Sequence, residues 1–512
     1  GERFLSVNKI LKKRAPFYIR VNLGKATLGE VQETLKSDGI ETVPDLACLT
    51  ALKVLSNPRK VKQSGAYKTG LLEIQDLNSQ ISCRTIPIEN GYNILDFCAG
   101  GGGKSLALSD RFSGTISAYD RDFLRMKDIP VRENEWDRRH VPYELANAEH
   151  LAMSDSVGMI NLSHFPIMDI EGPDAEQMLE YLSVAKVGGN TPIGKVVYTN
   201  FLDEDGGVHA DLTISRLGDN KYRIVTGGAD GNRDWVLLRN YRDDNGLNAD
   251  IRIRTHEVAT LGLWGPQAEA ALGNFIDPNE ITLENFPFVT AKNLTLSLSG
   301  GKKIEVWAAR ISYVGENGWE IYLNNNSEEG LALYDSLLEV GVVPVGIETY
   351  ANSRRLEKSF RLQGADLETE YNACEAAIQR PLVKEADFHG KAAYLIHREE
   401  EPCALLCTMT VDDLCVSGEA RYPVGIAPII DPDTGNVPLD SKGRRSYTTG
   451  MSYCPSLKEF VIMGYLPKEI AQEGKKLLIE YFNEDGDGLY PITVKIVGKG
   501  SLYDPSNEKV RT

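Results

Sequence analysis

The segment that decides the fold of most of the chain is Lys195–Leu217, KVVYTNFLDEDGGVHADLTISRL. Two runs rich in β-branched and aromatic residues flank the turn sequence DEDGG, which predicts two antiparallel strands joined by a tight turn. A further strand-like run, YRIVTGG, follows at 222–228. Strand and turn signals of this kind dominate after Trp136, so we expect a β-rich region from there onward.

The residues before Trp136 follow a different pattern. Up to about Arg132 the sequence mixes helical spacing, as in LGEVQETLKSDGI, with strand-like runs such as ISAYD. The charge changes at the same place, because residues 1–133 carry a net +5 and the remainder carries −22. Such asymmetry indicates two parts with different partners. The basic part can approach nucleic acid, and the acidic part is not expected to do so.

A second change in composition lies near Glu400, where a Gly- and Pro-rich β region begins. We therefore predict three domains, at 1–133, 134–398 and 399–512, in line with the two to four domains expected for 512 residues. The sequence has no apolar run of 18 or more residues, and its eight cysteines contain no CxxC pair. The expected setting is a reducing cytoplasm without membrane association.

Four consecutive glycines interrupt the first part, in ILDFCAGGGGKSLAL at 94–108. A strand ending at Asp96, a Gly-rich turn and then a helix is how doubly wound folds present backbone amides to a nucleotide. The segment lacks the first Gly of a Walker loop at the required offset. A second strand-like run ends at Asp120, where a carboxylate can accept hydrogen bonds from ribose hydroxyls. On these residues alone, a nucleotide pocket and a flexible hinge both stay open.

Four segments of this part carry a family resemblance: RAPFYIRVN (14–22), GLLEIQDLNSQ (70–80), the glycine segment and ISAYDRDFLRMKDIPVR (116–132). Together they resemble bacterial S-adenosylmethionine-dependent RNA cytosine-C5 methyltransferases. The resemblance implies a partial Rossmann-like α/β segment that binds S-adenosylmethionine, with Asp120 on the ribose. The remaining cofactor-binding residues that it implies are Asp96, Ala99, Gly100, Gly101, Gly102, Gly103 and Lys104.

Methylation of cytosine C5 needs a cysteine thiolate that adds to C6 of the ring. The family carries such cysteines in a Pro-Cys-Ser-Gly and a Thr-Cys motif, and neither motif occurs in this sequence. Cys403 is followed by Ala-Leu, and Cys454 by Pro-Ser. We therefore predict no RNA methylation by this chain and interpret residues 1–133 as an inactive S-adenosylmethionine-binding remnant. RNA is an expected partner only if this part is functional.

A longer series of motifs follows: VGMINLSHFPIMDIEGPDAEQMLEYLSV (157–184), the segment 195–217, LGLWGPQAEAAL (261–272), ISYVGENGWEIYL (311–323) and NSRRLEKSFRLQGADL (352–367). The series resembles the glycine-cleavage T-protein (aminomethyltransferase) family, and in particular the folate-binding C-terminal half of dimethylglycine and sarcosine dehydrogenases. This resemblance implies an α+β fold of three modules around a folate pocket, with a C-terminal β-barrel.

The T-protein resemblance also implies site residues. It places on Asp211 the role of orienting the folate nitrogen and accepting its proton. It places Tyr198 in the same pocket, and it pairs Glu320 with the pterin ring, whose adjacent N–H donors suit a bidentate carboxylate. From the residues alone, Asp211 can instead be a charge at a sheet edge facing water, and Tyr198 a half-buried strand tyrosine. Glu316 competes with Glu320, although its Gly-Glu-Asn-Gly setting is typical of a turn.

One departure concerns the arginine that T-proteins carry six residues before the glutamate of their Arg-Leu-Glu motif. Ala351 occupies that place here, so the contact of that arginine is lost or supplied elsewhere. Arg355 and Glu357 match the motif itself, and we expect them to form a helix-borne ion pair with each other rather than to contact a ligand.

The leading functional hypothesis is a tetrahydrofolate-dependent one-carbon transferase that acts on an aminomethyl, N-methyl or related donor. A small-molecule donor and a flavoprotein that hands over the carbon unit are the partners to consider, with S-adenosylmethionine as a second cofactor at residues 1–133. One alternative is a protein related to the RNA cytosine-C5 methyltransferases. Another is a non-enzymatic, folate-binding accessory protein.

Overall fold

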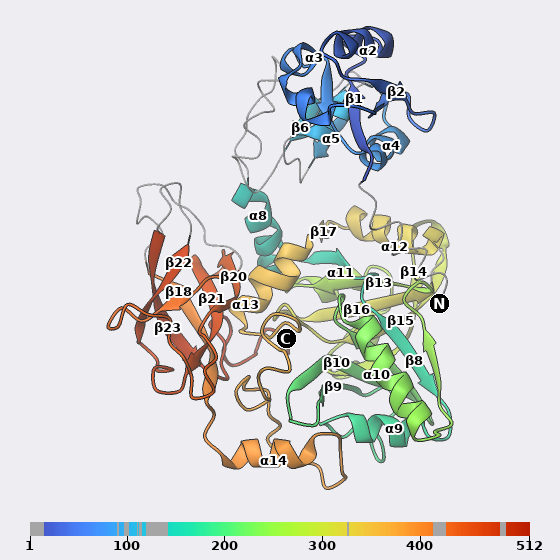
Figure 1. Ribbon diagram of the computed structural model, residues 1–512. Coiled ribbons are helices and arrows are strands. Elements are labelled where there is room, and N and C mark those ends of the chain that lie inside the picture. The colour runs from blue at the N-terminus through green and yellow to red at the C-terminus, as the bar shows by residue number, and fades with distance from the viewer. Residues whose placement is uncertain are drawn as a thin grey trace. The chain divides into compact units, whose positions relative to one another are not determined.

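The computed structural model describes residues 15–89, 92–96, 102–109, 111, 115–118, 142–324, 327–412, 426–481 and 488–511. The chain divides into two compact units, Gly1–Leu145 and Ala146–Thr512 (Figure 1). This division does not test the predicted domain boundaries at 133/134 and 398/399, which remain predictions. Within the described ranges, the helices are too short or too polar to cross a lipid bilayer.

The N-terminal unit contains a four-stranded antiparallel sheet in the order β2-β3-β1-β4. Its strands are β1 (Phe17–Val21), β2 (Thr42–Pro44), β3 (Ala51–Val54) and β4 (Leu72–Ile74), and its helices are α2 (Leu28–Ser37), η1 (Pro58–Gln63), α3 (Gly65–Lys68) and α4 (Leu77–Thr85). The helical spacing read in LGEVQETLKSDGI is confirmed by α2. This helix begins with a capping box, in which Thr27 and Glu30 satisfy each other's backbone N–H groups.

The glycine segment of the same unit forms a β-α-β element. Strands β5 (Asn93–Asp96) and β6 (Thr115–Ala118) pair in parallel, and helix α5 (Gly103–Ser109) lies between them in sequence. Parallel strands joined through a helix are the building block of doubly wound sheets. The described part of this sheet has two strands, which agrees with the predicted partial Rossmann-like segment.

The large unit begins within α8 (Pro142–Asp155) and contains a five-stranded antiparallel sheet in the order β12-β8-β11-β10-β9. Its strands are β8 (Ile167–Glu171), β9 (Val196–Leu202), β10 (Val208–Gly218), β11 (Lys221–Thr226) and β12 (Asp250–Ile253). Helices α9 (Ala175–Leu182) and α10 (Gly231–Asp244) cover one face through an apolar core. The hairpin predicted from the segment 195–217 is confirmed by β9 and β10.

A six-stranded sheet follows, in the order β14-β15-β16-β13-β7-β17. Its strands are β7 (Gly158–Asn161), β13 (Val258–Trp264), β14 (Thr290–Ser297), β15 (Lys303–Arg310), β16 (Gly318–Asn324) and β17 (Val343–Pro344). Helices α11 (Ala268–Leu272) and α12 (Ser327–Glu339) and the turn η2 (Pro278–Ile281) accompany it, and a short turn η3 (Ser299–Gly301) joins β14 to β15. An apolar cluster drawn from both sheets, including Val196 and Tyr322, packs the two sheets together.

The third module is a closed β-barrel. Its strands are β18 (Ala404–Val411), β19 (Ile429–Ile430), β20 (Thr448–Cys454), β21 (Glu459–Pro467), β22 (Lys476–Tyr481) and β23 (Gly488–Val497), in the order β19-β22-β23-β18-β21-β20. A bridge between Pro428 and Tyr447 joins the two outermost strands, and backbone bonds of Ile429 to Ser446 and Thr448 to Ala427 continue it. The segment before the barrel holds the π-helix η4 (Thr349–Arg354), α13 (Arg355–Glu357) and α14 (Lys391–Glu399).

Candidate functional site

Asp211 lies on the face of the five-stranded sheet that points away from α9 and α10. Its neighbours Ala210 and Leu212 enter the core with those helices, so strand alternation directs Asp211 to the opposite face. Across the hairpin, Asp211 is paired with Asn200, and Thr213 with Tyr198. Since β10 lies between β9 and β11, Asp211 is not on an edge strand. The alternative of a sheet-edge charge is therefore wrong.

Three groups favour the ionised form of the Asp211 carboxyl. Asn200 Nδ2 donates a hydrogen bond to its Oδ1 over 2.9 Å, the Tyr198 hydroxyl donates another, and the guanidinium of Arg361 attracts its charge. Burial outweighs these effects and raises the pKa of Asp211 to about 7. The carboxyl can therefore hold or release a proton near neutral pH.

Tyr198 combines accessibility with a position deep in the protein. Its side chain is 42% exposed, yet burial and the nearby Asp211 carboxylate raise the pKa of its phenol well above the usual value. The alternative of a half-buried strand tyrosine stays open beside the predicted role in the pocket.

Glu320 lies in the middle of the six-stranded sheet, where β16 runs between β13 and β15. The residue is only 8% exposed, and its Oε2 accepts a hydrogen bond from the Tyr322 hydroxyl. Burial raises the pKa of Glu320 to about 7 although this hydrogen bond lowers it. The Tyr322 ring is itself held against Trp307, with 4.8 Å between ring centroids. The Arg223 guanidinium lies 4.9 Å from the Trp307 centroid.

Two tyrosines that sequence reasoning missed lie near these carboxyls. Burial raises the pKa of Tyr313, and the negative charge of Asp211 adds to the shift. Burial likewise raises the pKa of Tyr350, and the negative charge of Glu320 adds to it. The two tyrosine rings lie 5.2 Å apart between centroids. Each carboxyl therefore acts on one member of a pair of tyrosines that are in ring contact. The available signal was the place of Tyr313 in the ISYVGEN motif.

Arg361 is a third residue that sequence reasoning missed. Its Nε donates to the Ala376 carbonyl over 3.0 Å, Nη1 to Ser359 over 2.6 Å and Nη2 to Gly498 over 2.7 Å. Within the described ranges no carboxylate forms a salt bridge with it, so its charge acts on Asp211 and Tyr198. It lies within the motif NSRRLEKSFRLQGADL, but nothing in its local spacing distinguishes it from an ordinary surface arginine.

Glu316 is not part of this site. It is buried and receives a hydrogen bond of 2.5 Å from Arg354 Nη2 and one of 2.8 Å from the Tyr503 hydroxyl. Arg354 also donates to Glu357 over 3.0 Å, and His150 Nε2 lies 3.1 Å from the same carboxylate. The backbone around Glu316 bends as the turn interpretation expects, with Gly315 at a φ of 79°, while its side chain is a member of a buried charge network.

The expected ion pair between Arg355 and Glu357 was also wrong. Arg355 forms a salt bridge with Asp366, whereas Glu357 forms one with Arg354. The reason is geometric, because residues two positions apart on a helix point in different directions, and 354 and 357 are three apart.

The structure describes part of the predicted nucleotide pocket. Asp96 is half-buried and accepts a hydrogen bond of 2.6 Å from Ser105 Oγ. Gly102 precedes α5, the Gly103 carbonyl accepts from Gln75 Nε2 over 3.0 Å, and Lys104 is exposed. Ala99, Gly100, Gly101 and Asp120 lie outside the described residues.

The charged side chains around Asp211 and Glu320 do not resemble a metal centre. Among the residues that the structure describes, no group of three or more His, Cys, Asp and Glu side chains is arranged to hold a metal ion. The six cysteines in those ranges are free thiols. The site instead offers two titrating carboxyls, an anchored guanidinium and several phenols, which suits an organic ligand with polar edges.

The chain is similar in sequence to several known proteins. Residues 127–385 match the model of the GCVT N-terminal domain. The chain is 31% identical over 369 residues to mitochondrial dimethylglycine dehydrogenase of Rattus norvegicus, across 70% of this chain and 39% of the relative. It therefore spans about two fifths of that relative's length. It is 29% identical over 334 residues to an aminomethyltransferase of Symbiobacterium thermophilum, across 64% of this chain and 83% of the relative.

A solved structure shares the fold of this region. Glycine cleavage system aminomethyltransferase T from Bartonella henselae superposes with a TM-score of 0.56 at 24% sequence identity, over 69% of this chain and 88% of that one. The likeness confirms the predicted α+β, three-module fold.

Proposed function

Because the chain belongs to the family of the GCVT N-terminal domain, we propose that it is a tetrahydrofolate-dependent one-carbon transferase. The observation that supports this most is the pair of carboxyls, Asp211 and Glu320, whose pKa values burial raises to about 7. Buried acids without a counterion are costly to a fold, and such groups concentrate at functional sites.

Glu320 and the surrounding phenols fit a reduced pterin. The pyrimidine edge of a pterin presents adjacent N–H donors, which a carboxylate accepts bidentately. Tyr322 occupies Oε2 of Glu320 from one side and fixes the carboxylate plane, which leaves Oε1 without a hydrogen-bond partner among the described residues. The rings of Tyr313 and Tyr350 supply flat apolar surface for the ligand.

Asp211 is the residue that we assign to proton transfer. Tetrahydrofolate, when bound, supplies the nitrogen that accepts the one-carbon unit. A base for that nitrogen works best with a pKa near the working pH, and burial gives Asp211 such a value. Asn200 and Tyr198 hold the carboxylate in place from the neighbouring strand. The nearby positive charge of Arg361 favours the ionised form of Asp211.

The donor is proposed to carry its carbon on an amine, as an aminomethyl or N-methyl group. The match to dimethylglycine dehydrogenase over about two fifths of that protein's length supports this class. A flavoprotein that oxidises the amine is the corresponding candidate partner. We further propose that the N-terminal unit is an inactive S-adenosylmethionine-binding remnant, because the two cysteine motifs of RNA cytosine methylation are missing.

Calorimetric titration with tetrahydrofolate tests the proposal, with S-adenosylmethionine as a second titrant. Glu320→Gln should weaken folate binding about tenfold or more, because it replaces a charged acceptor. Asp211→Asn should retain binding within a few-fold and lower the rate of one-carbon transfer by about 10²–10⁴. Glu204→Gln, at an exposed turn position, is the matched control.

The outcomes separate the candidate functions. Absence of folate binding by the unaltered chain would refute the proposal. Folate binding without any transfer activity, in both the unaltered chain and Asp211→Asn, would favour the accessory-protein alternative. Tight binding of S-adenosylmethionine with methyl transfer to RNA would favour the alternative related to RNA methyltransferases.

A further inference from the structure

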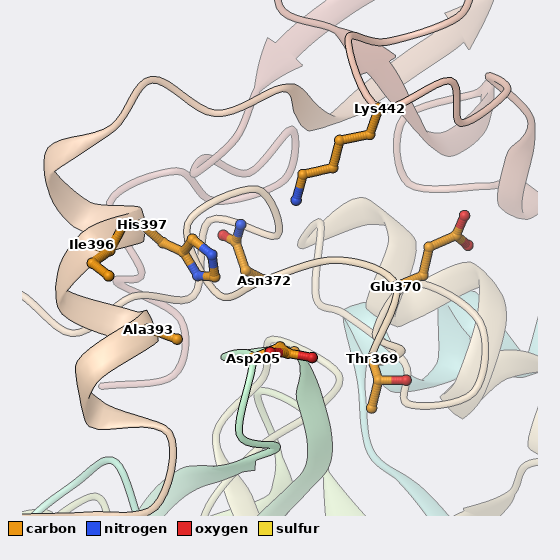
Figure 2. A pocket seen from close by; sticks show the side chains of 9 residues that line it. Asp205, Thr369, Glu370, Asn372, Ala393, Ile396, His397 and Lys442 are labelled. Atoms are coloured by element: carbon orange, nitrogen blue, oxygen red, sulfur yellow. The ribbon is translucent and has the colours of Figure 1, made fainter.

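A cavity of about 400 Å³ lies away from Asp211 and Glu320, where the β9–β10 turn, the segment before α14, α14 itself and a loop of the barrel meet. Asp205 and Gly207 come from the turn, Asn372 from the segment, Ile396 and His397 from α14, and Lys442 from the barrel loop. Figure 2 shows the Lys442 side chain reaching toward His397 and Asn372, with Asp205 on the opposite wall. The cavity therefore has walls of opposite charge.

The turn and the barrel loop hold their charged residues in place through the backbone. In the turn, Asp203 Oδ1 accepts the Gly207 N–H over 2.7 Å, which fixes the loop that carries Asp205. In the barrel, Asp440 Oδ1 accepts the Lys442 N–H over 2.9 Å. The carboxylate of Asp205 and the ammonium of Lys442 themselves have no partner among the described residues, so both are available to a ligand.

Asn372 supplies the most informative group of the cavity. The residue is 9% exposed, and its Oδ1 accepts the N–H groups of Cys374 and Glu375 over 2.9 and 3.0 Å. These two bonds fix the orientation of the amide, so its Nδ2 is the atom that takes no part in them. Within the described ranges Nδ2 donates to no protein group, so it is available to a ligand. Nδ1 of His397 is a buried atom without a partner there, although buried polar atoms are normally satisfied.

We propose that this cavity binds a free α-amino acid. The Lys442 ammonium and the Asn372 amide would receive its carboxylate, Asp205 would receive its ammonium group, and Ile396 and Ala393 offer an aliphatic wall to its side chain. A simple anion would meet the carboxylates of Asp205 and Glu370, and a simple cation would meet Lys442. Only a molecule that carries both charges matches both walls. The inference does not depend on the proposed folate site.

Calorimetry of the full chain with leucine and with glycine tests the inference, with the decarboxylated and deaminated analogues of leucine as single-charge probes. Asp205→Asn and Lys442→Gln should each weaken amino-acid binding about tenfold, equivalent to about 1.4 kcal/mol. The single-charge analogues should bind at least about tenfold more weakly than leucine itself. Glu204→Gln and Lys499→Gln, exposed positions outside the cavity, should change nothing.

Three results would overturn the inference. The first is no heat of binding with either amino acid up to about 10 mM. The second is equal binding of leucine and its deaminated analogue, which would make the cavity an anion site. The third is unchanged affinity in both Asp205→Asn and Lys442→Gln. Folate titration of the same two variants keeps this test separate, since neither residue belongs to the site of Asp211 and Glu320.

Discussion

The carboxyl of Glu320 is buried at a cost to the stability of the fold. Inside the described ranges it has no cation within salt-bridge distance, and its one side-chain partner is the Tyr322 hydroxyl. In the unfolded chain the same carboxyl titrates near its usual value of about 4.3, whereas burial raises the pKa to about 7 in the folded protein. The folded state therefore binds the proton more tightly than the unfolded state. Stability must fall as the pH rises from about 4.3 to about 7.

Glu320→Gln should remove this penalty. We expect the free energy of unfolding at pH 8 to rise by about 2–4 kcal/mol, because each unit of raised pKa corresponds to about 1.4 kcal/mol. At about pH 4, where the carboxyl is largely protonated in both the folded and the unfolded chain, the gain should nearly vanish. Urea denaturation at both pH values measures the difference. Glu204→Gln, at an exposed position, should show no gain at either pH. A gain in Glu320→Gln that is equal at both pH values would contradict the argument.

Tyr322→Phe should move the titration of Glu320 further upward. The lost hydrogen bond stabilises the ionised carboxylate, so its removal raises the pKa of Glu320 by roughly 0.5–1 unit. The pH at which folate binding reaches half its maximal strength should shift to a higher value by the same amount. Calorimetric titrations between pH 6 and 9 would show it. Tyr334→Phe is the control, because Tyr334 packs against the apolar cluster of the same sheet. An unshifted pH profile in Tyr322→Phe would count against the role of Tyr322 in positioning Glu320.

At the scale of elements, β16 depends on the glycine that begins it. Gly318 has a φ of 152°, and a Cβ at this position would lie 1.9 Å from the Leu263 carbonyl oxygen on the paired strand β13. The close approach lets β16 start beside Trp264 and carries Glu320 two residues further into the sheet. A backbone collision at this point cannot be relieved by rotating a side chain.

Gly318→Ala should therefore destabilise the large unit by about 3 kcal/mol or more and weaken folate binding with it. Gly330→Ala provides the contrast, because Gly330 lies in α12 and its Cβ would meet only Ala259 at 4.0 Å. Replacing a helical glycine by alanine in open space should be neutral or stabilise by up to about 1 kcal/mol. Thermal unfolding of the two variants tests both signs, and similar midpoints for the pair would refute the steric argument.

Sequence patterns predicted these elements better than their contacts. Period-two alternation identified the hairpin and placed Asp211 on a strand, because strand direction alone decides which face a residue joins. The ion pairs were mispredicted, since Arg354 and Arg355 are adjacent in sequence and only the packing of the barrel and the C-terminal tail decides their partners. Sequence patterns did not identify Tyr313 and Arg361 for the same reason, because only the tertiary fold brings each of them near Asp211.

At the scale of the whole large unit, the network around Arg354 ties distant segments together. Its guanidinium contacts Glu316 before β16 and Glu357 in α13, and it lies 4.6 Å from the ring centroid of Tyr503 near the end of the described chain. His150 from α8 joins the same group through Glu357. Burial lowers the pKa of His150, so the neutral imidazole is its form at neutral pH.

Arg354→Met should be strongly destabilising, because it leaves two buried carboxylates without their cation. Removing one member of a buried ion pair typically costs about 3–5 kcal/mol. Arg252→Met is the matched control, since Arg252 pairs with Glu257 at the surface with 60% of its side chain exposed, and such a pair contributes less than about 1 kcal/mol. Urea midpoints of the two variants give the comparison, and equal midpoints would show that the network contributes nothing.

The hydrogen bond from Arg361 to the carbonyl of Gly498 has a consequence for how the protein matures. The cation that tunes Asp211 is anchored in part by a residue that leaves the ribosome more than a hundred positions later. A nascent chain that has not yet reached Gly498 cannot form this hydrogen bond. The guanidinium of Arg361 therefore acquires its full set of anchoring bonds only near the end of synthesis.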